Sequence, residues 1–188
     1  MRPSWFVALP VAAGSWFERV QELPAGVRRF HPEDLHLTVA FLGGVEADAA
    51  RRAFEVAGQI RLAPLEVTLG DVVPMGNPQR PSALSGRLVV GEQLLAAAIT
   101  EVRDAIFAAA GVPREQRPAL PHITVARPGR TASDAERSEA LRWAASLELG
   151  GPRVRLTELA LYTWSEARRE RLFQVVERLP LRGLVAQP

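Results

Sequence analysis

The sequence predicts an α+β fold whose sheet is built mainly from antiparallel strands. Segments with helical periodicity alternate with short apolar segments typical of strands. Several strands follow one another without an intervening helix, which favours antiparallel pairing over the parallel sheet of a doubly wound protein. The order of elements repeats, and each half contains one strand that carries a histidine. The chain is therefore expected to consist of two comparable halves.

The first half is expected to contain four strands and two helices. The apolar segment "SWFVALP" predicts the first strand, and "GSWFERVQEL" predicts a short amphipathic helix. Alternation in "LHLTVAFL" predicts a strand with one face in the core. The acidic start of "EADAARRAFEVAGQI" is typical of a helix N-terminus. Two further strands are separated by a turn rich in Pro and Gly. In chain order the ranges are 4–10, 14–23, 35–42, 46–60, 64–73 and 82–90, with the turn at 74–81.

The second half repeats this order. A long helix over 91–111 ends at Gly111, and Pro113 follows as a stop signal. The loop at 112–120 leads into a strand at 121–127. A helix over 131–149 begins with Ser133 as its N-cap and Glu136 three residues later, the pattern of a capping box. Two strands at 153–164 and 170–181, joined by a polar turn at 165–169, complete the prediction.

Composition places the chain among ordinary globular proteins. Its 188 residues are 47% apolar and 23% charged, and the net charge is +2 with a pI of about 10.2. All 23 basic residues are arginine, which favours polyanionic partners, although codon bias explains the same excess. The absence of cysteine excludes disulfides, thiolate metal sites and a cysteine nucleophile, and it fits a cytoplasmic location. Pro10 interrupts the N-terminal apolar stretch, so we expect a strand there rather than a signal peptide, and no membrane partner.

Two of the three histidines share a pentapeptide pattern. His36 begins "HLTVA" and His122 begins "HITVA", so that each histidine is followed two residues later by a threonine. The chain has only seven threonines, which makes this duplication improbable by chance. His31 has no such threonine and precedes a proline, so we interpret it as a surface turn residue.

The spacing has a physical meaning on a strand. Residues i and i+2 face the same side and are separated by roughly 6.6 Å, so an imidazole and a hydroxyl reach one small group. Two such strands supply two imidazoles and two hydroxyls. A phosphate fits this set, because its oxygens accept hydrogen bonds from Thr38 and Thr124 while His36 and His122 transfer protons. A single histidine of this kind is more often a packed core residue. Metal binding is disfavoured, because no cysteine or carboxylate pattern accompanies the pair.

The two motifs also carry a resemblance. "HLTVAFLG" and "PHITVAR" resemble the paired H-x-T-x signatures of the 2H phosphoesterase superfamily. With "WFVALP", "NPQRPSAL" and "LALYTWSEARRERLFQVVERLPL", the chain is similar in particular to the bacterial RNA 2′,3′-cyclic phosphodiesterases of the 2′-5′ RNA ligase family. The resemblance implies that residues 1–188 form one domain of two lobes related by a pseudo-twofold axis, with the active site in the cleft between them.

The resemblance further implies an activity. The enzyme is expected to hydrolyse 2′,3′-cyclic phosphates at RNA ends, tRNA fragments among them, to 2′-phosphomonoesters as a monomer without metal or cofactor. His36 becomes the proton donor, His122 the proton acceptor, and Thr38 and Thr124 the phosphate-binding residues. The sequence by itself leaves the donor and acceptor interchangeable. Alternatives are a related enzyme acting on small cyclic nucleotides, an enzyme joining 2′-5′ RNA ends, and a nucleotide- or RNA-binding module without turnover.

Several arginines and aromatic residues are secondary candidates. Arg127 ends the second motif, and strand parity places it opposite His122 unless the strand twists, so a substrate contact and a position on the cleft rim both remain open. Arg114 and Arg117 are candidate RNA contacts or solvated loop charges. The remaining candidates are expected to be structural: Trp5, Phe41 and Tyr162 as core residues, and Arg168, Arg169 and Arg171 as solvated charges of a turn.

Overall fold

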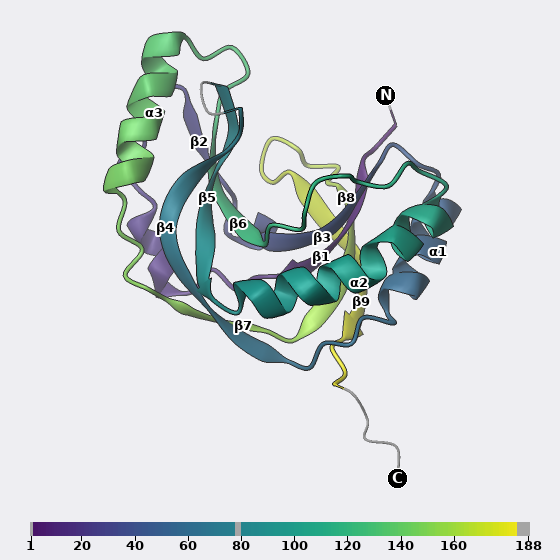
Figure 1. Ribbon diagram of the computed structural model, residues 1–188. Helices are drawn as coiled ribbons and strands as arrows, with labels where there is room; N and C mark the ends of the chain where they lie inside the picture. Colours follow the sequence, from purple (N-terminus) through teal and green to yellow (C-terminus); the bar gives the residue numbers. More distant parts are fainter. Residues whose placement is uncertain (1, 78–79, 184–188) are drawn as a thin grey trace.

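The computed structural model describes residues 2–77 and 80–183 (Figure 1). Its strands are β1 (Trp5–Pro10), β2 (Val27–Arg29), β3 (His36–Gly43), β4 (Leu65–Asn77), β5 (Arg80–Val90), β6 (His122–Pro128), β7 (Arg153–Leu156), β8 (Glu158–Trp164) and β9 (Phe173–Pro180). Its α-helices are α1 (Ala47–Ala57), α2 (Glu92–Ala110) and α3 (Asp134–Ser146), with 3-10 turns at Ser15–Arg19 and Pro32–Asp34. Helices and strands alternate as the sequence predicts.

All of these strands belong to one curved sheet with antiparallel pairing. The strand order is β7-β4-β5-β6-β3-β1-β8-β9, and β2 pairs with β6 off this path. We call β3, β1, β8 and β9 the first wing and β6, β5, β4 and β7 the second wing. The two histidine strands, β3 and β6, are neighbours where the wings meet. The predicted α+β class with antiparallel strands is confirmed.

The two wings do not correspond to the two halves of the sequence. The second wing takes β4 and β5 from the first half of the chain, whereas the first wing takes β8 and β9 from its C-terminal part. The chain crosses over near Thr157, where the strand expected at 153–164 divides into β7, which pairs with β4, and β8, which pairs with β1. The prediction of a single continuous strand was therefore wrong, because its two ends serve different wings.

The helices cover the sheet unequally. Helices α1 and α2 pack on each other; α2 contacts β3, and α1 contacts β1 and β8, whereas α3 packs on β4, β5 and β6 (Figure 1). The capping box forms as expected, since the Ser133 hydroxyl accepts from the Glu136 amide and the Glu136 carboxylate accepts from the Ser133 amide. Helix α2 ends at Gly111, whose φ of 71° is the left-handed conformation that glycine adopts without strain.

The core lies between these helices and one face of the sheet. Val7, Leu9, Leu37 and Ile123 are completely buried there. Their neighbours in sequence point to the other face, where Phe6, Ala8, Ala160 and Tyr162 form a separate small apolar cluster. This second face carries the histidines. Strand alternation therefore separates the packing side of β1 and β3 from the side that carries the histidines.

Short elements are where the sequence prediction failed. The helix expected at 14–23 is one 3-10 turn, Ser15–Arg19, preceded by Gly14 with φ 56° and followed within a few residues by Pro24. Strand β2 was not expected, because three residues are too few to show alternation. Strands β4 and β5 extend into the turn expected at 74–81, whose residues 78–79 lie outside the described part.

Two further sequence expectations can be compared with the structure. Trp5 and Tyr162 are buried as predicted, but Phe41 is 60% exposed, so its placement in the core was wrong. Register shifts in the β1–β3 pair, between Trp5 and Phe6 and between Val7 and Ala8, accompany this outward turn. No helix within residues 2–77 and 80–183 is long and apolar enough to cross a membrane.

Candidate active site

The contact between β3 and β6 brings the two histidine motifs together. Leu37 pairs with Ile123 in antiparallel register, and both side chains are completely buried in the core. In such a register, the residues on either side of this pair face away from the core. His36 is therefore level with Thr124, and Thr38 is level with His122. The four residues that the sequence selected lie on one face of the sheet, at the junction of the wings.

Both histidine rings are oriented by the same backbone contact. The Nδ1 atom of His36 is 2.6 Å from the carbonyl oxygen of Asp34, and Nδ1 of His122 is 2.7 Å from the carbonyl oxygen of Leu120. A carbonyl oxygen only accepts, so Nδ1 carries the proton in each ring and Nε2 has a free lone pair in the neutral form. The hydrogen bond thus leaves Nε2 of both rings available for proton transfer.

The electrostatic setting disfavours a positive charge on either ring. Burial is the largest cause that lowers the pKa of His36, to about 4; the Asp34 carbonyl opposes it, and the charges of Arg127 and His122 add to it. Burial also lowers the pKa of His122, against the Leu120 carbonyl and together with Arg127. Both imidazoles are therefore neutral near pH 7 in the free protein. A bound anion would raise both pKa values by opposing the charge of Arg127.

The surroundings of His36 are aromatic. Its ring centroid is 4.7 Å from that of Phe6, 5.4 Å from Tyr162, 5.5 Å from Phe173 and 6.5 Å from Phe30. These rings come from β1, β8, β9 and the segment before β3. They pack against the imidazole, so its position is set by packing as well as by the Asp34 carbonyl.

The surroundings of His122 are polar. Its partner on β5 is Arg87, and the partner of Thr124 is Ser85. The Ser85 and Thr124 hydroxyl oxygens are 3.1 Å apart, and Ser85 is completely buried. The guanidinium of Arg87 contacts the Glu92 carboxylate at 2.7 Å. The sequence did not reveal Ser85, because only the β5–β6 register shows that its hydroxyl lies beside Thr124.

Asp34 connects His36 to the loop before β9. Its carboxylate is completely buried and accepts hydrogen bonds from the backbone amides of Leu172, at 2.7 Å, and Phe173, at 3.0 Å. The backbone carbonyl of the same residue holds the His36 ring. Arg171 pairs with Glu33 nearby. One aspartate therefore fixes both the imidazole and the aromatic side chain that packs against it, and no local sequence pattern indicated this role.

The three secondary arginines have different settings. The guanidinium of Arg127 lies 4.9 Å from the ring centroid of Phe30, and it lines a cavity of about 440 Å³ together with Arg28 and Asp34. Its charge lowers the pKa of both histidines. Arg114 and Arg117 instead pair with Asp104, at 3.7 Å, and Glu115, at 2.7 Å. Within residues 2–77 and 80–183, no contact joins those two arginines to the histidines.

The remaining sequence candidates lie outside the site. His31 is exposed, and its Nδ1 accepts from the Glu33 amide at 3.2 Å, which caps the short turn as expected of a turn residue. Arg168 lies over the Trp164 ring at 4.1 Å, and Arg171 is ion-paired, so neither is simply solvated. Among the described residues, no three His, Cys, Asp or Glu side chains are grouped as metal ligands.

Comparisons with known proteins agree with this arrangement. The family model described as LigT like Phosphoesterase matches residues 9–84, a span that includes His36 and Thr38. The fold is similar to that of E. coli LigT complexed with 3′-AMP, with a TM-score of 0.71 and 24% identity over 96% of this chain and 99% of the other. The family match over residues 9–84 and the shared fold support the 2H phosphoesterase superfamily for this chain.

Two other solved structures extend the comparison of the fold. TT0787 of Thermus thermophilus gives a TM-score of 0.70 at 21% identity, over 96% of this chain and 99% of the other. Kluyveromyces marxianus Usb1 gives 0.57 at 14% identity, also over 96% and 99%. No curated protein matches the chain. The family match supports a phosphodiesterase-type activity on phosphodiester or cyclic phosphate substrates.

Proposed function

We propose that this 2H phosphoesterase hydrolyses 2′,3′-cyclic phosphate ends of RNA to 2′-phosphomonoesters without a metal ion. The observation that carries the proposal is the matched pair of imidazoles at the β3–β6 junction. Each is held through Nδ1 by a backbone carbonyl, so each directs Nε2 to the common face. A protein that only binds a nucleotide or RNA, without turnover, needs no such pair of proton-transfer groups. The E. coli structure with 3′-AMP supports a nucleotide as the ligand class.

The geometry suggests how the bond is broken. Nε2 of His122 removes a proton from water while the water oxygen forms a bond to phosphorus. The P–O3′ bond breaks, and protonated His36 gives its Nε2 proton to the departing 3′-oxygen, so the products are a 2′-phosphate and a 3′-hydroxyl. The hydroxyls of Thr38 and Thr124 donate to the non-bridging oxygens. The two histidines return to their starting states by exchanging protons with solvent.

Arg127 supports this scheme as a substrate contact. Its guanidinium is near enough to both histidines to lower their pKa values, so it is also near a phosphate placed between them. An anionic substrate beside Arg127 restores the proton affinity of His36 that the free enzyme lacks. Arg114 and Arg117, engaged with acidic neighbours, remain candidates for RNA further from the scissile phosphate.

The donor and acceptor roles have a competing assignment. The pKa of His36 falls to about 4, and that of His122 is lowered with less burial around it. In the free enzyme His122 therefore holds a proton more readily, which favours it as the acid and His36 as the base. The superfamily resemblance favours the opposite assignment. We propose His36 as the donor, with substrate charge supplying the needed rise in its pKa.

The test uses an oligonucleotide that ends in a 2′,3′-cyclic phosphate, incubated with the protein in EDTA. We expect a 2′-phosphate product and a loss of roughly 10²–10⁴-fold in kcat/KM for His36→Ala or His122→Ala. His31→Ala is the matched control, because it removes an exposed histidine outside the site. Absence of turnover between pH 5 and 9 would refute the proposal. A 3′-phosphate product would show that the 2′-oxygen, and not the 3′-oxygen, is the leaving group.

A further inference from the structure

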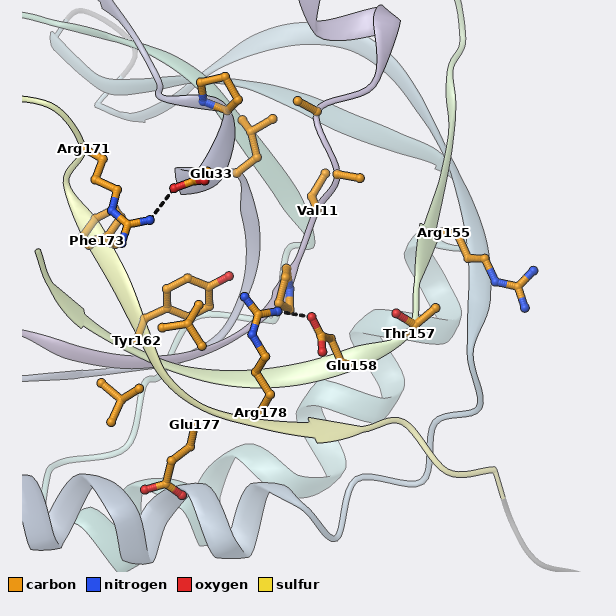
Figure 2. Close-up of a pocket in the computed structure, with 17 residues that line it drawn as sticks. Val11, Glu33, Arg155, Thr157, Glu158, Tyr162, Arg171, Phe173, Glu177 and Arg178 are labelled. Carbon is orange, nitrogen blue, oxygen red and sulfur yellow. Dashed lines mark hydrogen bonds and ion pairs between the residues drawn. The ribbon is translucent and has the colours of Figure 1, made fainter.

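A cavity of about 840 Å³ opens beside His36, on the histidine-bearing face of the first wing (Figure 2). Tyr162 and Phe173, two of the rings that pack on His36, form part of its wall, and Val11 lies opposite. Glu158 and Arg178 line the same cavity and form an ion pair. Its size suits a complete nucleotide. The cavity is therefore adjacent to the proposed proton donor but distinct from the phosphate-binding threonines.

Tyr162 contributes a polar group to the wall of this cavity. The residue is 1% exposed, and Figure 2 shows its hydroxyl pointing into the cavity on the side of the ion pair. The charges of Arg178 and Glu158 both act on the pKa of this hydroxyl, although burial is the main cause that raises it. No residue within 2–77 and 80–183 hydrogen bonds the Tyr162 hydroxyl. Because the hydroxyl faces the open cavity, it is available to a ligand.

The sheet register sets the distance from the chemistry to the ion pair. His36 pairs with Pro10 on β1, and the β1–β8 register continued by two residues places Glu158 level with Pro10 on the other side. Two strand spacings separate His36 from Glu158, which is roughly 10 Å. That is about the distance from the cyclic phosphate of a nucleotide to the far edge of its base. A nucleotide with its phosphate at the histidines therefore extends its base to Glu158 and Arg178.

We propose that this cavity binds the base of the terminal nucleotide and selects guanine. The proposal rests on the proposed hydrolysis of 2′,3′-cyclic phosphates. Guanine presents an acceptor at O6 beside two donors, N1–H and the N2 amino group. A guanidinium next to a carboxylate offers the complementary donor and two acceptors. Uracil offers a single ring N–H to the carboxylate, while adenine and cytosine offer one amino group and no adjacent ring N–H.

The apolar wall of the cavity does not discriminate between bases. The half-buried Phe173 contributes ring surface, which is tolerant of base identity because every base has an aromatic face, whereas the ring of Tyr162 is covered. Discrimination is therefore assigned to Glu158 and Arg178, and ring contact to the aromatic residues. Substitution of Glu158 or Arg178 should therefore reduce the preference among bases, whereas substitution of the aromatic residues should weaken binding of every base.

The experiment compares four substrates on the full-length protein: 2′,3′-cyclic GMP, UMP, AMP and CMP. We expect kcat/KM for the guanosine substrate to exceed that for each of the others by roughly tenfold to hundredfold. Glu158→Gln leaves one acceptor and adds a donor, so guanine loses the acceptor for one of its two adjacent donors, whereas the remaining oxygen still accepts the single ring N–H of uracil. Most of the preference for guanosine over uridine should therefore disappear. Glu66→Gln is the matched control, because Glu66 pairs with Arg153 at 3.4 Å on the far strands of the second wing.

A binding measurement separates this inference from the proposed function. Calorimetric titration with guanosine 2′-monophosphate and adenosine 2′-monophosphate needs no turnover. Preferential binding of the guanosine ligand that is lost in Glu158→Gln supports the base site, even if no cyclic phosphate is hydrolysed. Equal turnover of all four substrates, or a guanosine preference that survives Glu158→Gln, overturns the base site and leaves the hydrolase proposal standing.

Discussion

The two histidine motifs have the same local geometry and different surroundings. Each imidazole is held through Nδ1 by the carbonyl two residues earlier, at 2.6 Å in the first wing and 2.7 Å in the second. Beyond that contact, His36 lies among four aromatic rings next to a buried aspartate, whereas His122 lies beside Arg87. The repeated sequence therefore fixes how each ring is oriented, and the neighbouring strands determine how readily it takes a proton.

This difference gives the two wings separate tasks. The first wing packs aromatic rings on His36 and provides a large cavity with Tyr162 and Phe173 in its wall. The second wing contributes hydroxyls, with Thr124 and the buried Ser85 only 3.1 Å apart. We interpret the first wing as the side that holds the nucleoside and the second as the side that holds the phosphate and the attacking water.

The strongest test of this comparison removes the need for one proton. In a substrate whose 3′-bridging oxygen is replaced by sulfur, the leaving thiolate needs no protonation, since thiols have a pKa near 8.5. With this substrate we expect His36→Ala to recover most of its roughly 10²–10⁴-fold loss, while His122→Ala recovers little. Rates of single turnover for the two variants on the sulfur and oxygen substrates provide the measurement. Recovery by His122→Ala instead would assign the acid to His122.

A second test breaks the connection that is particular to the first wing. The Asp34 carboxylate accepts hydrogen bonds from two backbone amides. In Asp34→Asn the side-chain NH2 group replaces one of the two oxygens, so one backbone N–H faces a donor and loses its acceptor. We expect a loss of about 1–3 kcal/mol in the free energy of unfolding. Because Phe173 and the His36 ring are also loosened, the pH dependence of kcat/KM should shift as well. Urea unfolding and pH–rate profiles measure the two effects.

The exposed Asp71 on β4 provides the control for that substitution. Asp71→Asn should leave both the urea midpoint and the pH profile unchanged. If Asp34→Asn lowers stability but leaves the pH profile in place, Asp34 is a structural residue and does not position His36.

The smallest expected effect concerns stability against acid. The pKa of His36 is about 4 in the folded protein, below its ordinary value of 6.5, so the unfolded chain binds more protons between those values. This contribution to stability is full above pH 6.5 and decreases as the pH falls from 6.5 toward 4. Between pH 7 and pH 5 it amounts to at most about 2 kcal/mol. His36→Gln should reduce the decrease in unfolding free energy over this range, as measured by urea titration.

The same experiment on the second wing sharpens the comparison. His122 is also shifted downward, with less burial, so His122→Gln should flatten the pH dependence less than His36→Gln does. An equal effect of both substitutions would mean that the two surroundings do not differ electrostatically.

Local patterns accounted for most elements and for the motif residues. Strands β1, β3 and β6 and helix α2 begin and end within a residue or two of their expected bounds, because alternation, capping residues and stop signals act over a few neighbours. The same alternation placed each threonine on the face of its histidine. The failures were the short β2, the 3-10 turn at Ser15–Arg19, and the exposed Phe41, where few residues or a register shift weaken the pattern.

The sequence by itself determined the fold class, the two H-x-T motifs and the superfamily they resemble, since these depend on periods of two and 3.6 residues and on short fixed spacings. Only the tertiary structure decided which strands form each wing, and that Ser85, Asp34 and Tyr162 join the site. It also decided that Arg114 and Arg117 pair with acidic neighbours. The physical reason is that register and chain crossover join residues far apart in sequence, and no local pattern encodes those pairings.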